Sequence, residues 1–91
     1  MESFFDKLRK LRIEMIALIC DKTRNSGNSL LLPAGTKYTH YSESFDKGED
    51  RELVEIYFND DDSLVFLDEE GYEALSSEID TDSLVLIADQ L

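Results

Sequence analysis

The chain has 91 residues, 42% of them hydrophobic and 33% charged, so a single globular domain spanning residues 1–91 is expected. Its formal net charge is −12, from 21 acidic and nine basic side chains. This excess argues against direct nucleic-acid binding, which needs cations at the phosphates. The single cysteine and single histidine exclude an internal disulfide framework and a Cys/His zinc finger.

The first predicted element is an amphipathic helix from about residue 3 to about residue 22. Ser3 is a suitable N-cap, and Leu11 is expected in the core. Arg12 interrupts the apolar side, where its stem can lie on apolar surface while its guanidinium stays in water. The apolar residues that share this side of the helix are Phe4, Phe5, Leu8, Leu11, Met15, Ile16, Leu18 and Ile19.

The same helix carries a second, smaller apolar stripe formed by Ile13, Ala17 and Cys20. A helix that is apolar on more than one side is expected to be covered on more than one side. We favour cover by the C-terminal helix of the same chain. The alternative is a self-association surface, which would make the protein a weak homodimer rather than a monomer.

From residue 29 the pattern changes to the alternation typical of strands. Residues 51–58, 63–68 and about 72–75 are expected as an antiparallel meander, with turns at 47–50, 59–62 and 68–71. Residues 29–33 and 36–45 are extended, and Pro33 either limits the first of them to a sheet edge or marks its end. In the strand 51–58, alternation places Val54, Ile56 and Phe58 on one face, so that Val54 lies in the core, and Leu53, Glu55 and Tyr57 on the other.

A short C-terminal helix closes the chain. Asp80 is its expected N-cap, and its apolar face consists of Leu84, Ile87, Ala88 and Leu91. The predicted fold class is α+β, with an N-terminal amphipathic helix, a three- to four-stranded antiparallel meander, and a short C-terminal helix packed on one face of the sheet.

Charge is distributed unevenly along the chain. Residues 1–47 hold eight basic and six acidic side chains, whereas residues 48–91 hold fifteen acidic ones and a single basic one, Arg51. This asymmetry predicts either a solubilising surface or a surface that attracts a basic protein partner. The side chains expected to bind such a partner are Asp60, Asp61, Asp62, Asp68, Glu69 and Glu70.

No catalytic, cofactor or metal site is predicted. The acidic run that starts at Asn59 has Leu64 where an EF-hand calcium loop requires glycine. His40 has no local catalytic signature, and Cys20 is interpreted as a small buried hydrophobe. No stretch is long and apolar enough to cross a membrane, so we expect a cytoplasmic, non-enzymatic interaction or regulatory protein.

Three segments carry a resemblance: residues 31–33 (Leu-Leu-Pro), 68–72 (Asp-Glu-Glu-Gly-Tyr) and 80–84 (Asp-Thr-Asp-Ser-Leu). In their order the chain resembles small uncharacterised proteins of Bacteroides-type bacteria and their phages or mobile elements, a resemblance that implies no activity. Two alternative functions stay open. One is a DNA mimic of the anti-restriction or anti-CRISPR type, and the other is an immunity protein or antitoxin against a basic nuclease.

Overall fold

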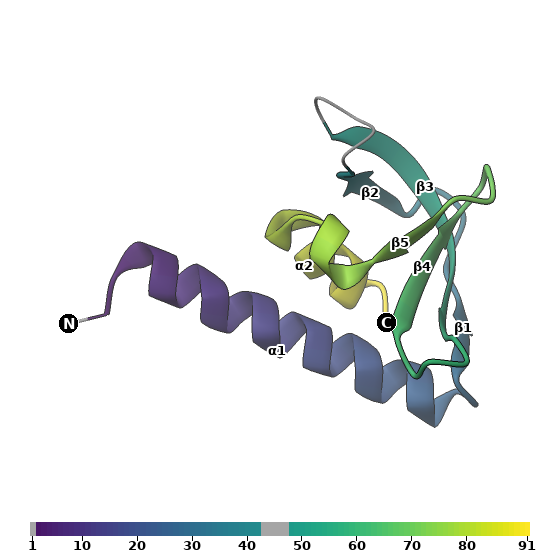
Figure 1. Ribbon diagram of the computed structural model, residues 1–91, viewed down its shortest axis with the longest axis horizontal. Coiled ribbons are helices and arrows are strands. Elements are labelled where there is room, and N and C mark those ends of the chain that lie inside the picture. The colour runs from purple at the N-terminus through teal and green to yellow at the C-terminus, as the bar shows by residue number, and fades with distance from the viewer. Residues whose placement is uncertain (1, 43–47) are drawn as a thin grey trace.

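A computed structural model describes residues 2–42 and 48–91, and in it two helices cover one face of an antiparallel sheet (Figure 1). This arrangement confirms the predicted α+β class. The sheet has five strands, because the extended region after the first helix forms two separate strands. The elements in chain order are α1 (Phe4–Asn25), β1 (Ser29–Leu31), β2 (Lys37–His40), β3 (Glu49–Phe58), β4 (Leu64–Asp68), β5 (Glu73–Leu75), a 3₁₀ turn (Ser76–Glu78) and α2 (Thr81–Asp89).

β3 is the central strand. β4 pairs with one of its edges, and β1 and β2 pair with different parts of β3. Ser29 in β1 lies opposite Tyr57, and His40 in β2 lies opposite Glu49. Pro33 lies in the interruption between β1 and β2, where a residue without an amide hydrogen costs no ladder hydrogen bond.

Two predicted boundaries in this region differ from the structure. Glu49 and Asp50 were expected in a turn, but both pair with β2 and belong to β3. The backbone partners that β2 provides hold these two acidic residues in a strand despite their low strand propensity. The expected extended segment 36–45 is a strand only over Lys37–His40; its residues 43–45, and Lys47 of the expected turn, lie outside the described residues.

A β-bulge in β3 overturns the predicted position of Val54. The pairing register with β4 shifts between Leu53 and Glu55, which leaves Val54 without a partner on β4. The extra residue inverts the in-and-out alternation on one side of the bulge, so Leu53 and Ile56 both enter the core. Val54 is 39% exposed, and the expectation that it lies in the core is wrong.

The core lies between the sheet and the two helices. β4 contributes Leu64 and Phe66 to it, and α2 contributes its expected apolar face. The buried cluster consists of Ile19, Tyr38, Leu53, Ile56, Leu64, Phe66, Ala74, Ile79, Leu84, Ile87 and Ala88.

α1 begins at the predicted N-cap, where Ser3 and Asp6 form a reciprocal capping box, and it ends at Asn25. Arg12 does not leave its guanidinium in water, contrary to expectation. This group donates to the carbonyl oxygens of Ser76 and Ile79, the latter at 2.7 Å. Arg12 therefore ties the middle of α1 to the segment that leads into α2.

Only the C-terminal half of α1 contacts the core, through Ile19 and the partly buried Met15, Ile16 and Cys20. The N-terminal half projects beyond the sheet and α2 (Figure 1). Leu11 is consequently 36% exposed, and the expectation that it lies in the core is wrong. The helical periodicity was sufficient to find the helix, but it could not show where the rest of the fold stops covering it.

The N-cap of α2 provides a local test of the fold. The Asp80 carboxylate accepts a hydrogen bond from the backbone N–H of Ser83 at 2.8 Å. Replacing Asp80 with alanine is expected to lower the free energy of unfolding by about 1 kcal/mol, because an amide of the first turn loses its partner. Urea unfolding followed by circular dichroism measures this loss. Asp82→Ala is the control, since Asp82 is exposed in the first turn, and an equal loss at both positions would contradict the capping role.

Candidate functional site

The six acidic residues predicted to bind a partner do not form one surface. Asp60, Asp61 and Asp62 lie in the hairpin between β3 and β4, and the other three lie at the turn between β4 and β5. These connections are at opposite ends of β4, a five-residue strand about 17 Å long at the usual rise per residue. The carboxylates therefore divide into two groups.

The first group is presented by a well-ordered turn. The side-chain oxygen of Asn59 accepts hydrogen bonds from the backbone N–H groups of Asp61 and Ser63, both at 3.0 Å. This frame leaves Asp60 and Asp61 exposed, and no cation of the described chain pairs with either. Asp62 is also exposed but faces Arg24 of α1, with 3.5 Å between its Oδ1 and Nη1 of the arginine.

In the second group, at the β4–β5 turn, one of the three acidic residues is buried. Asp68 is only 3% exposed. Its Oδ1 accepts from the backbone N–H groups of Glu70 and Tyr72, at 2.8 and 2.9 Å, and its Oδ2 accepts from Arg51 at 3.0 Å. Asp68 therefore shapes the β4–β5 turn, and the structure corrects its expected placement on a partner-binding surface.

Arg51 is buried and is the centre of a cluster of charges. Its Nη1 contacts Asp68 and, at 3.3 Å, Glu70, and its Nη2 contacts Glu49. The guanidinium also lies over the ring of Tyr72, 4.3 Å from the centroid. Burial opposes the charge, but the nearby carboxylates of Asp68, Glu49 and Glu70 outweigh it and raise the pKa of Arg51. The sequence signal for this cluster was the single basic residue among fifteen acidic ones, although its role could not be read from that signal.

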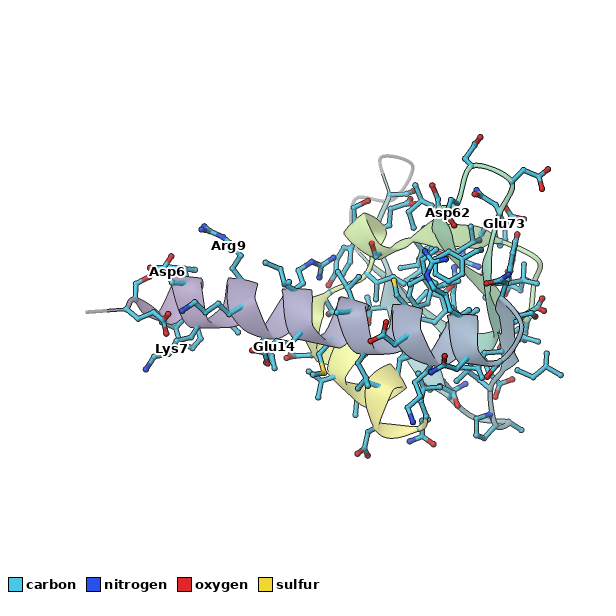
Figure 2. The ribbon with its side chains drawn as sticks, turned by 90° about the horizontal axis from the view of Figure 1, so that it is seen from below. Asp6, Lys7, Arg9, Glu14, Asp62 and Glu73 are labelled. Atoms are coloured by element: carbon cyan, nitrogen blue, oxygen red, sulfur yellow. The ribbon has the colours of Figure 1, made fainter. Side chains whose placement is uncertain are left out.

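Carboxylates also occur on the outer sheet face, the face opposite the helices; Glu73 is exposed and Glu55 is half-buried. Glu55 and Glu73 point to this side with Tyr57, and their neighbours Leu31 and Leu75 are 75% and 44% exposed. The Tyr57 hydroxyl donates to Glu73 at 2.7 Å, and this hydrogen bond is the main cause that raises the pKa of Tyr57 to about 12. No helix covers this face (Figure 1), and Figure 2 shows Glu73 and Asp62 on the body of the molecule. Neither Glu55 nor Glu73 was among the acidic residues predicted to bind a partner.

The second stripe of α1 is divided by the fold. Ile13 is 61% exposed and Ala17 is exposed, so α2 does not cover them, contrary to the cover that we favoured. Cys20 is partly buried and packs against the core, as expected of a small hydrophobe. Burial is the main cause that raises the pKa of the Cys20 thiol, which disfavours the reactive thiolate.

The described residues hold no candidate metal-binding group. No group of three or more His, Cys, Asp or Glu side chains within residues 2–42 and 48–91 is arranged to hold a metal ion. Between α2 and β2 lie two shallow neighbouring hollows of about 260 and 310 Å³, which share Lys37 and Leu86 in their walls. His40 is buried, and its Nε2 lies 3.2 Å from Glu78. Among the described helices, none has the length and apolar character needed to span a membrane.

Comparison of this chain with protein-family models, with curated proteins and with solved structures finds no match.

Proposed function

We propose that this chain is a small, non-enzymatic, cytoplasmic interaction protein that binds a protein with a basic surface. The outer sheet face and the two acidic hairpins at its ends would form the binding surface. The observation that carries this proposal is the combination of exposed apolar side chains, such as Leu31 and Leu75, with nearby carboxylates. Among these carboxylates, Asp60, Asp61, Glu69 and Glu73 have no cationic partner in the described chain. Exposed apolar side chains next to charged ones are typical of protein–protein interfaces.

Charge supports a basic partner. The acidic half of the chain contains only one cation, Arg51, which is buried and held by its own carboxylates. The electrostatic potential at the surface formed by residues 48–91 is therefore negative. A negative surface accelerates the diffusional encounter with a positively charged protein. The partner would place lysine or arginine side chains near Asp60, Asp61, Glu69 and Glu73.

The first experiment identifies the partner. The immobilised chain is exposed to host lysate, and bound proteins are recovered at about 50 mM and about 300 mM salt, where screening differs strongly. Proteins that are retained only at low salt and lost by the variant Asp60→Asn/Asp61→Asn/Glu73→Gln are the expected result. If the variant retained the same proteins, these acidic residues would not contribute to binding, and their role would be to keep the chain soluble.

For the identified partner, Asp60→Asn/Asp61→Asn is expected to lower the association rate constant several-fold at low salt while changing the dissociation rate constant less. The reason is that exposed rim charges act mainly on the diffusional encounter. Stopped-flow or surface-based kinetics at several salt concentrations measures both constants. The matched control is Asp21→Asn/Asp89→Asn, which removes the same charge from the helices. An equal loss of rate in the control would mean that net charge alone, and not this surface, steers the partner.

The DNA-mimic and immunity-protein alternatives name different partners for the same carboxylates. A DNA mimic should be displaced from its partner by duplex DNA, and an immunity protein should inhibit a nuclease. Burial of Asp68 and pairing of Asp62 with Arg24 shorten the acidic rows that favoured the mimic. Competition with a short DNA duplex separates the DNA mimic from the main proposal, and an assay of nuclease inhibition separates the immunity protein from it.

A further inference from the structure

α1 carries a regular apolar seam that the fold leaves largely uncovered. We call this set the α1 seam: its residues follow each other at alternating spacings of four and three, the spacing of the contact positions in a coiled coil. Phe4 is 69% exposed, and Leu11 and Leu18 are 36% and 37% exposed. The members of the α1 seam are Phe4, Leu8, Leu11, Met15 and Leu18.

The α1 seam is distinct from the side of α1 that faces the core. Fully buried Ile19 and Thr23, and Arg12 with its bonds to the 3₁₀ turn, define the core-facing side. At 100° per residue, the seam is centred roughly a quarter-turn away from that side. Met15 packs partly against the core, but packing within the monomer does not account for the exposed seam members Phe4, Leu11 and Leu18. Figure 1 shows no element beside the N-terminal half of α1.

The distribution of charge along the chain favours a second copy of this protein as the partner of the α1 seam. The charge of residues 2–14, the N-terminal half of α1 with the residues just before it, is balanced, since Arg12 is bound internally. Its other charged side chains are Glu2, Asp6 and Glu14 against Lys7, Arg9 and Lys10. The other half of the chain carries a charge of −14. Two copies of this protein would repel each other if their sheets met, but not if their balanced helices met. The seam is thus the place where a second copy can dock at the lowest electrostatic cost.

We propose that two copies of this chain form a dimer by antiparallel pairing of their α1 seams. Antiparallel pairing keeps the two acidic bodies at opposite ends of the helix pair, whereas parallel pairing would place them side by side. Lys7 and Glu14 lie on the same flank of the helix, one heptad apart (Figure 2). In an antiparallel pair, this flank faces the same flank of the partner helix, so Lys7 of one copy meets Glu14 of the other.

Sedimentation equilibrium from about 10 µM to about 1 mM tests the dimer. The wild-type chain is expected to form dimers within this range, and Leu8→Glu/Leu11→Glu is expected to raise the dissociation constant at least about tenfold, because two charges enter the apolar contact. The matched control is Ile13→Glu/Ala17→Glu, on another side of the same helix, which should leave the constant unchanged. Circular dichroism checks that both variants keep the fold.

A wild-type chain that stays monomeric at about 1 mM would overturn the proposal. So would a dimer that the control variant dissociates and Leu8→Glu/Leu11→Glu does not, since the interface would then be the stripe of Ile13 and Ala17.

Charge reversal tests the orientation. At low salt, Lys7→Glu and Glu14→Lys are each expected to weaken the dimer a few-fold, and the double variant is expected to restore it, because each exchanged charge again meets its opposite. Weakening in both single variants without restoration in the double variant would overturn the antiparallel arrangement. This proposal is independent of the acidic surface, since none of these substitutions changes the sheet or its hairpins.

Discussion

Replacing Phe66 with alanine is expected to lower the free energy of unfolding by about 3–5 kcal/mol. Phe66 is completely buried at the centre of the sheet, opposite Ile56 of β3 and Ala74 of β5. The change removes the apolar contacts of the ring and leaves a cavity that close-packed neighbours fill only in part. A domain of this length is stable by about 5–14 kcal/mol in total, so the loss is a large part of its stability. Urea unfolding followed by far-ultraviolet circular dichroism measures it.

The controls for this prediction are Leu11→Ala and Val54→Ala. Both side chains are more than one-third exposed, Leu11 on the projecting half of α1 and Val54 at the bulge of β3. Each change is expected to cost less than about 1 kcal/mol. If Val54→Ala were as damaging as Phe66→Ala, the bulge would not be where the structure places it.

Replacing Arg51 with methionine is also expected to lower the free energy of unfolding by about 3–5 kcal/mol. Here the loss comes from an unpaired buried charge and not from a cavity. The variant keeps much of the apolar stem but leaves the buried Asp68 carboxylate without its cation. An unpaired carboxylate in the interior loses its hydration and gains no compensating attraction. The measurement is the same urea unfolding, at neutral pH.

Two further variants separate the ion pair from simple packing. Adding Asp68→Asn to Arg51→Met is expected to recover part of the loss, because the neutral amide can keep the turn hydrogen bonds through its oxygen without an unpaired charge. The variant Arg51→Lys is expected to have a lower free energy of unfolding than the wild type, because a lysine ammonium cannot bridge several carboxylates as a guanidinium does. Additive losses in the double variant would contradict a direct coupling between Arg51 and Asp68.

These expectations bear on how binding experiments are read. Asp68 is buried and cannot contact a partner directly, but its side chain holds the β4–β5 turn. A substitution of Asp68 would therefore weaken any partner complex indirectly, by disturbing this turn. Asp60 and Asp61 are exposed and free of such structural bonds in their carboxylates, so their replacement reports on the surface alone. The acidic hairpin between β3 and β4 is therefore the better place to test electrostatic attraction.

Much of the fold follows from local patterns in the sequence. Helical spacing and the Ser3 cap predicted α1, strand alternation predicted a strand over residues 63–68, where β4 lies, and Asp80 marked the start of α2. These features depend on residues that are close in sequence. Apolar periodicity shows the type of element, and capping residues show where a helix begins. The uneven charge was equally visible, because it is a count and requires no geometry.

The tertiary structure alone decided which of these residues are covered. The bulge exposed Val54 and buried Leu53, since one unpaired residue inverts an alternation that the sequence presents as continuous. The length of the sheet left Leu11 and Ile13 in the open, because a helix can be longer than the surface that packs against it. The pairing of β3 with β4 brought Arg51 to Asp68, 17 positions later in the chain, and removed one acid from the predicted set. Burial and ion pairing depend on contacts between distant segments, and no local pattern contains that information.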